Sequence, residues 1–154
     1  MKFILQCVEK ATATKSDGSV IEIGNGILVY VCFNKKDKED DLNWAIRKTF
    51  SICLWEDEKD GRPWRKGITD ISGQIIFIYE PRLYASVDNS SEPSYEELMP
   101  EGDAIKMYSK LIEKANASHK QDHVITIPFG EKAKLDFVND GPITITVDSF
   151  HRRN

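Results

Sequence analysis

The chain has 154 residues, 40% of them hydrophobic and 30% charged, with a formal net charge of −4. This length suits one domain with a real hydrophobic core, and the acidic balance argues against a broad nucleic-acid-binding face, though not against contact with a short nucleic-acid end. Residues 1–8 lack the long apolar stretch of a signal peptide, and no run approaches the ~20 apolar residues of a membrane helix. We therefore expect a cytosolic protein that does not associate with membranes.

The first third of the chain has the patterns of strands. Lys2–Glu9 alternates apolar and polar residues, and 11–14 continues as an extended segment. Asp17-Gly18 indicates a hairpin, because both turn positions tolerate positive φ, and 19–23 would be the returning strand. Gly26–Phe33 is an almost unbroken apolar run rich in β-branched and aromatic residues, as is typical of a central buried strand.

Two segments have the period of an amphipathic helix. In Lys38–Ser51 the apolar residues fall on one helical face, and Asp37 is the expected cap at its start. Asp103–Ala115 carries a second apolar stripe. No comparable period occurs elsewhere, so we expect two helices.

Further strands are expected between and after the helices. They are a short strand over 51–55, a second central strand over Gln74–Tyr79, and three late strands over 124–128, 134–138 and 143–147. The polar segment 89–100 contains two prolines and reads as a loop with one helical turn. The order predicts a single α+β domain over 1–150, with a curved, barrel-like mixed sheet, two helices on one side of it, and a frayed tail over 151–154.

Several kinds of chemistry are missing from the sequence. There is no phosphate-binding glycine loop and no Ser/His/Asp arrangement that can be argued. His119 and His123 are four residues apart but lack a third ligand, so no metal is expected, nor any cofactor. The cysteines, which are Cys7, Cys32 and Cys53, lie in apolar segments without a CxxC pair, and we interpret them as buried reduced thiols.

One late motif is specific. The run Asn139-Asp140-Gly141-Pro142-Ile143-Thr144 resembles the NxGPVT motif of the D-aminoacyl-tRNA deacylases. Weaker similarities cover nearly the whole chain in the same order: the start at 5–8 (LQCV), the strand entry at 24–29, the segment 54–58, Pro93-Ser94-Tyr95 and the helix around Tyr108. The start and the strand over 29–33 are also similar to a branch of the family that accepts L-alanine mischarged on tRNA.

The resemblance implies a homodimer that cleaves the ester between an amino acid and the 3′-terminal adenosine of tRNA. It assigns Gly141 and Pro142 to the partner's pocket, where their backbone carbonyls would screen out L-side chains. The other substrate-binding residues that it implies are Gln6, Cys7, Asn139, Ile143 and Thr144. The Gly-Pro bond is cis in the D-specific branch, whereas general X–Pro statistics predict a trans bond and a plain turn here.

A second motif departs from the family. The catalytic SQxTL segment, whose backbone N–H groups are thought to hold the oxyanion, is replaced by Tyr79-Glu80-Pro81-Arg82-Leu83, which keeps only the leucine. Tyr79 would crowd the pocket and Glu80 would bring negative charge to it. Pro81 has no N–H to donate, and losing one oxyanion donor costs ~10²–10³ in rate. Arg82 could instead hold a phosphate or a carboxylate.

Outside this motif, Cys7 and Glu92 replace family arginines and Trp64 replaces an asparagine. Two functions therefore stay open. The chain is either an aminoacyl-tRNA deacylase acting on D-aminoacyl or mischarged tRNA, or a non-catalytic relative that binds a tRNA end or a protein partner.

Overall fold

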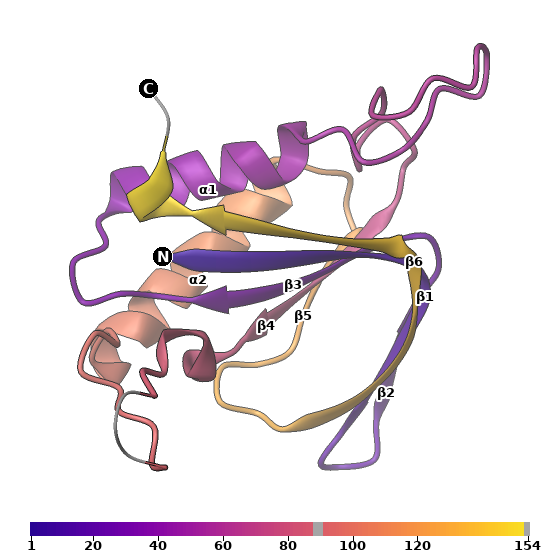
Figure 1. Ribbon diagram of the computed structural model, residues 1–154. Coiled ribbons are helices and arrows are strands. Elements are labelled where there is room, and N and C mark those ends of the chain that lie inside the picture. Colours follow the sequence, from indigo (N-terminus) through magenta and orange to yellow (C-terminus); the bar gives the residue numbers. More distant parts are fainter. Residues whose placement is uncertain (88–90, 153–154) are drawn as a thin grey trace.

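The computed structural model describes residues 1–87 and 91–152 and has the predicted fold class. One α+β domain contains a curled mixed sheet with both helices on one of its faces (Figure 1). The strands are β1 (Lys2–Lys15), β2 (Val20–Ile23), β3 (Gly26–Cys32), β4 (Gln74–Tyr79), β5 (Val124–Thr126) and β6 (Ala133–Asp148). The helices are α1 (Glu39–Ser51) and α2 (Glu101–Ala117), with short 3₁₀ turns at Pro81–Tyr84 and Ser149–His151.

The curl of the sheet comes from the length of β1. The first half of β1 pairs with β3 and its second half with β2, whereas β6 runs antiparallel along its other edge. Beyond β3 the order continues through β4 and β5, and both of these pairings are parallel. One long strand thus joins a flat part of the sheet to a curled part, which gives a half-barrel.

Two hydrophobic clusters stabilise the two sides of the sheet. The larger cluster lies between the sheet and the helices and includes Phe3, Phe77 and Leu111, each 0% exposed. The smaller one fills the curled part and includes Leu28 and Ile76. Because both faces of β3 and β4 are covered, their sequences read as continuous apolar runs.

Both predicted helices are present, but the expected cap of the first is wrong. Lys38 is the N-cap residue of α1, and its N–H donates to the Asp41 carboxylate at 2.8 Å. The buried carboxylate of Asp37 accepts the Asn34 N–H and contacts the Met1 amino group instead. Burial lowers the pKa of that amino group, and the contact with Asp37 opposes the shift.

Two strand predictions are wrong. Residues 51–55 do not form a strand, since only Trp55 makes an isolated bridge, to Lys66. The segments 134–138 and 143–147 are parts of one strand, β6, which pairs with β1 on both sides of a bulge: the register passes from Asn139 opposite Val8 to Thr144 opposite Gln6. The register of this pairing shifts between Gln6 and Val8 and again between Val8 and Lys10.

Some expectations fall partly outside the described residues. These are the loop over 89–100, which overlaps 88–90, and the tail over 151–154, of which 153 and 154 are not described. Within the tail, the Arg152 guanidinium pairs with Asp41 and lies over the Trp44 ring. Among the helices of the described ranges, none is long and apolar enough to cross a membrane.

Candidate active site

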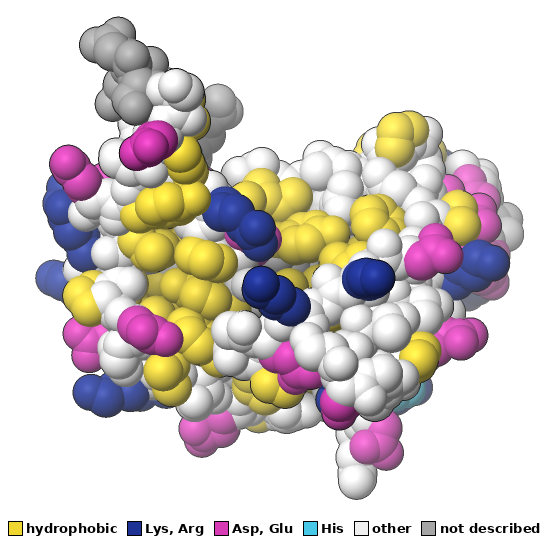
Figure 2. Space-filling view, turned by 90° about the horizontal axis from the view of Figure 1, so that it is seen from below, with side chains coloured by type: hydrophobic (Ala, Val, Ile, Leu, Met, Phe, Trp, Pro, Cys, Tyr) yellow, Lys and Arg dark blue, Asp and Glu magenta, His cyan; other side chains and the backbone are white. Residues whose placement is uncertain are grey.

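The structure places the loop 79–83 at the rim of a large groove of about 1300 Å³. The groove opens where β4 ends and β6 begins, and the end of β1 and the segment 95–101 complete its wall. Its lining includes Tyr79, Glu80, Pro81, Arg82, Tyr30, Met99, Phe129, Lys15, Lys132 and Lys134, but not Leu83. Seen from below, hydrophobic side chains on this side of the molecule border Lys and Arg side chains (Figure 2).

Two stacked aromatic rings form one wall of the groove. The rings of Tyr79 and Phe129 lie 4.1 Å apart at an interplanar angle of 26°. Tyr108 of α2 meets both rings edge-on from the buried side. Its hydroxyl contacts two carbonyl oxygens, those of Phe77 at 3.0 Å and Ile127 at 2.9 Å. The Tyr79 side chain is therefore held in the wall, and burial raises its pKa to about 12.

The backbone N–H groups of the loop are already engaged within the chain. The N–H of Glu80 donates to Val31 O at 2.8 Å and that of Leu83 to Glu80 O at 3.3 Å. The N–H of Arg82 donates to the Glu80 carboxylate at 3.0 Å, and Pro81 has none.

Glu80 and Arg82 also form a bidentate ion pair. Arg82 donates from Nε to Oε1 at 2.6 Å and from Nη2 to Oε2 at 2.8 Å. This pairing raises the pKa of the guanidinium above its usual value. The Arg82 side chain is 73% exposed, although Glu80 fixes the edge of the guanidinium that carries Nε and Nη2.

Sequence reasoning missed the part of the groove that the β5–β6 connection and the start of β6 provide. Phe129 and the cations Lys132 and Lys134 come from the β5–β6 connection and the start of β6. Lys132 and Lys134 alternate with the apolar Ala133 and Leu135, which is the signal that could have indicated a charged strand face. The lining also contains Glu80, Glu101 and Glu131, so the aromatic wall is bordered by groups of both signs, with the cations in slight excess.

The Asn-Asp-Gly-Pro residues form a second group that does not line this groove. The Asn139 side-chain amide donates to Cys7 O at 2.7 Å and to Ile143 O at 3.2 Å, which ties the irregular part of β6 to β1. Gly141 has φ +110°, and a Cβ there would lie 2.6 Å from Ile143 Cγ1. The Gly141–Pro142 bond is cis, so the trans expectation is wrong.

The remaining members of this group lie close by on the same two strands. Gln6 of β1 and Thr144 of β6 are register partners, with the Gln6 amide 3.5 Å from the Thr144 hydroxyl. Gly141 and Pro142 are both exposed. The structure therefore brings the predicted substrate-binding residues together, but away from the loop 79–83 of the same chain.

The thiols and imidazoles do not form a catalytic or metal site in the ranges 1–87 and 91–152. Burial raises the pKa of Cys7 to about 11 and that of Cys32 to about 12, so both are protonated at neutral pH. His119 and His123 both hydrogen-bond the Gly73 carbonyl, at 2.7 and 3.1 Å. No group of three potential metal ligands occurs in the described part of the chain.

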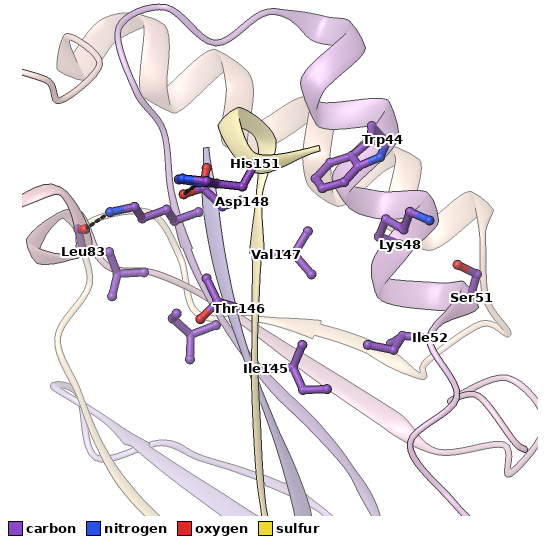
Figure 3. Close-up of a pocket in the computed structure, with 12 residues that line it drawn as sticks. Trp44, Lys48, Ser51, Ile52, Leu83, Ile145, Thr146, Val147, Asp148 and His151 are labelled. Atoms are coloured by element: carbon purple, nitrogen blue, oxygen red, sulfur yellow. Dashed lines mark hydrogen bonds and ion pairs between the residues drawn. The ribbon is translucent and has the colours of Figure 1, made fainter. Parts of the chain in front are cut away.

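A second cavity, of about 900 Å³, lies beside β6 and is separate from the groove, although it also touches the loop 79–83 at Leu83. In Figure 3, Ile145 and Val147 of β6 point toward Trp44 and Ile52 at α1, whereas Leu83 lies across the strand. The Lys2 amino group is 3.4 Å from the Leu83 carbonyl there. Leu83 thus belongs to this cavity rather than to the groove of its loop neighbours.

Comparisons with known proteins agree with this geometry. The family model for D-Tyr-tRNA(Tyr) deacylase matches residues 4–148. The chain is 30% identical to a D-aminoacyl-tRNA deacylase of Flavobacterium psychrophilum over 97% of both chains. It is 28% identical to D-aminoacyl-tRNA deacylase 1 of Leishmania major over 99% of both.

Among solved structures, the c-Myc DNA Unwinding Element Binding Protein superposes with a TM-score of 0.88 at 28% identity, over 96% of this chain and 98% of that one. A probable eukaryotic D-amino acid tRNA deacylase shares the fold, with a TM-score of 0.81 at 13% identity over 95% and 97% of the two chains. Since the family model spans nearly the whole sequence, the chain belongs to the D-Tyr-tRNA(Tyr) deacylase family.

Proposed function

We propose that this protein is a proofreading enzyme that hydrolyses the ester of D-aminoacyl-tRNA or of other mischarged aminoacyl-tRNA. One observation carries the proposal: the groove beside the loop 79–83, which the resemblance aligns with the family's catalytic segment, combines an aromatic wall with lysines at one end of its mixed-charge lining. Such a combination suits a single-stranded nucleic-acid end, because bases stack on aromatic rings and cations attract phosphates.

In this reading the terminal adenine stacks on the exposed part of the Tyr79–Phe129 wall, and Lys132 and Lys134 face the phosphates. Water then attacks the ester carbonyl carbon and the carbonyl oxygen becomes negative. The bond to the ribose oxygen breaks next, and that oxygen takes up the proton that the water loses. The groove's contribution is positioning and electrostatic stabilisation.

We further propose a symmetric homodimer in which Gly141 and Pro142 enter the partner's groove. Their exposure, and their absence from the groove of their own chain, support this arrangement. A symmetric contact repeats one patch on both subunits, so each groove would receive one such tip. Asn139 would fix the tip through its two hydrogen bonds across the β6 irregularity.

The non-catalytic alternative is less well supported. Its basis is the altered loop, yet the relatives that match over nearly the whole chain carry deacylase names. A cytosolic location remains our prediction, and the three free cysteines are consistent with a reducing compartment.

The deciding experiment is an incubation of the purified protein with tRNA charged with a D-amino acid, with glycine and with L-alanine. We expect hydrolysis of the D-aminoacyl ester well above the rate without enzyme. Hydrolysis of L-alanyl-tRNA in its place would move the substrate to the branch that accepts mischarged L-alanine. Binding of uncharged and charged tRNA without hydrolysis of any ester would favour the non-catalytic alternative.

A further inference from the structure

The loop 79–83 has a shortage of free donors. Its N–H groups at Glu80, Arg82 and Leu83 all have acceptors within the chain, and Pro81 lacks an N–H. A developing oxyanion needs donors that are unengaged and already in place. The main chain of these four residues therefore has none to offer, whatever the relatives' loops provide.

A side-chain donor lies on the same loop. Arg82 uses Nε and one N–H of Nη2 to bind Glu80. Among residues 1–87 and 91–152, the N–H groups of Nη1 and the second N–H of Nη2 have no acceptor, which leaves a pair of donors at the end of the guanidinium. Such a planar fork matches an anionic oxygen or a pair of oxygens. The side chain lines the groove and is 73% exposed, so a ligand can reach the fork.

The fork is better fixed than the other cations of the groove. Lys132, just before β6, and Lys134, on β6, are exposed side chains, whereas Arg82 is held at two atoms by a carboxylate that also binds its own N–H. Fixing a donor before the reaction lowers the cost of reorganisation during it. This distinguishes Arg82 as a group able to act on the reacting ester rather than only on the phosphates.

We infer that the Arg82 guanidinium stabilises the oxyanion in this chain and replaces the missing backbone donors, with Glu80 as the residue that positions it. The inference rests on the proposed function. Under this inference, catalysis by this protein depends on a side chain, whereas the family is thought to use backbone N–H groups. Glu80, which the sequence suggested would repel the substrate, here serves to orient the arginine.

The test compares single-turnover hydrolysis of D-aminoacyl-tRNA by the unmodified protein and by Arg82→Ala, Arg82→Lys and Glu80→Gln. We expect the rate at saturating enzyme to fall ~10²-fold or more in Arg82→Ala, as for loss of one oxyanion donor. Arg82→Lys should fall less, and Glu80→Gln least. Free guanidinium ion at millimolar concentration should restore part of the rate of Arg82→Ala, and it should not raise the rate of the other proteins.

A second variant restores the backbone donor. Pro81→Ala adds an N–H to the loop, so Pro81→Ala/Arg82→Ala should be faster than Arg82→Ala. Lys106→Gln is the matched control, because Lys106 is a 77% exposed cation outside the groove, and its loss should leave the saturated rate unchanged. Circular dichroism melting checks that every variant is folded.

The outcomes separate the two proposals. In the first outcome, the unmodified protein hydrolyses its substrate, and Arg82→Ala keeps the saturated rate but binds tRNA more weakly and with less dependence on salt. Arg82 is then a phosphate contact. The inference is wrong in that case, but the proposed function stands. If the unmodified protein hydrolyses none of the esters, the proposed function fails and the inference fails with it.

Discussion

Phe129 is the residue on which we expect the terminal base of the substrate to stack. Its ring is half-buried against Tyr79 and it lines the groove. Stacking of a base on an aromatic ring is worth ~1–3 kcal/mol, so Phe129→Ala should weaken binding of a CCA-ended RNA about 5- to 150-fold. Fluorescence anisotropy would measure this. Phe150→Ala removes an aromatic that is 53% exposed outside the groove, and should leave the affinity unchanged.

The thiols give a second prediction at the scale of single residues. Burial raises the pKa of Cys7 from 9.0 to about 11 and that of Cys32 from 9.0 to about 12. Cys53 is only partly buried, so the prediction of a buried thiol is wrong for this residue. At pH 8 a thiol-specific disulfide reagent should therefore modify one thiol per native chain rapidly, and Cys53→Ala should abolish that phase. Three rapidly reacting thiols in the folded protein would contradict the buried positions of Cys7 and Cys32.

The same shifts determine a dependence of stability on pH. Folding favours the protonated form of both thiols, because their pKa values are higher in the folded chain than in the unfolded chain. Their contribution to the free energy of unfolding is therefore fully present below pH 9. It is lost as the pH rises from 9 toward 11–12, because the thiols of the unfolded chain ionise in this range before those of the folded chain. Urea unfolding across this range should show falling stability. In Cys7→Ala and in Cys32→Ala the fall should be shallower than in the unmodified protein.

At the scale of elements, the parallel pairing of β3 and β4 depends on a residue without a side chain. Gly26 is paired with Gln74, and a Cβ on Gly26 would lie 2.0 Å from the Gln74 carbonyl oxygen. Gly26→Ala must push the strands apart, and we expect it to cost ~1–3 kcal/mol or more in the free energy of unfolding. Gly24→Ala, where a Cβ meets nothing within 4 Å, is the control and should be close to neutral. Equal stability of the two variants in urea would show that β3 and β4 are not held this closely.

The elements also show what the sequence could predict. Periodicity indicated α1 and α2 because each buries a single stripe of side chains. It failed for β6, where Asn139-Asp140-Gly141-Pro142 has the composition of a turn. The chain bulges there but does not reverse, because β1 is long enough for pairing to resume at Thr144 opposite Gln6. Pairing along β1 on both sides of the bulge is a long-range effect, and it keeps residues 133–148 in one strand despite the local preference for a turn.

The site was predictable to a similar extent. The motif at 139–144 and the loop at 79–83 could be located from the sequence, but the engagement of the loop's N–H groups depends on Val31 and on the Glu80 rotamer. Phe129 was not predicted because the stack that makes it part of the groove joins residues 50 positions apart.

At the scale of the whole molecule, the proposed exchange of tips between subunits can be tested by complementation. Pro142→Arg should block the groove of the partner subunit, and Phe129→Ala should weaken substrate binding in the groove of the subunit that carries it. In coexpressed mixtures half of the dimers are mixed and each has one intact site, so activity below the KM should recover to about a quarter of that of the unmodified protein. Absence of any recovery, or a monomer in sedimentation at micromolar concentration, would contradict the homodimer.

The Tyr108 hydroxyl has a mechanical consequence for the groove. It contacts the carbonyls of Phe77 and Ile127, and the two rings of the wall, Tyr79 and Phe129, each follow one of these residues by two positions. This oxygen, together with the Ile127 N–H that donates to the Phe77 carbonyl at 3.0 Å, thus fixes the spacing of the stacked pair. Loss of that oxygen would loosen the spacing, and the rings would then have to be ordered again on each encounter with a ligand. The cost would appear as an unfavourable binding entropy, because a preorganised surface avoids that loss of freedom.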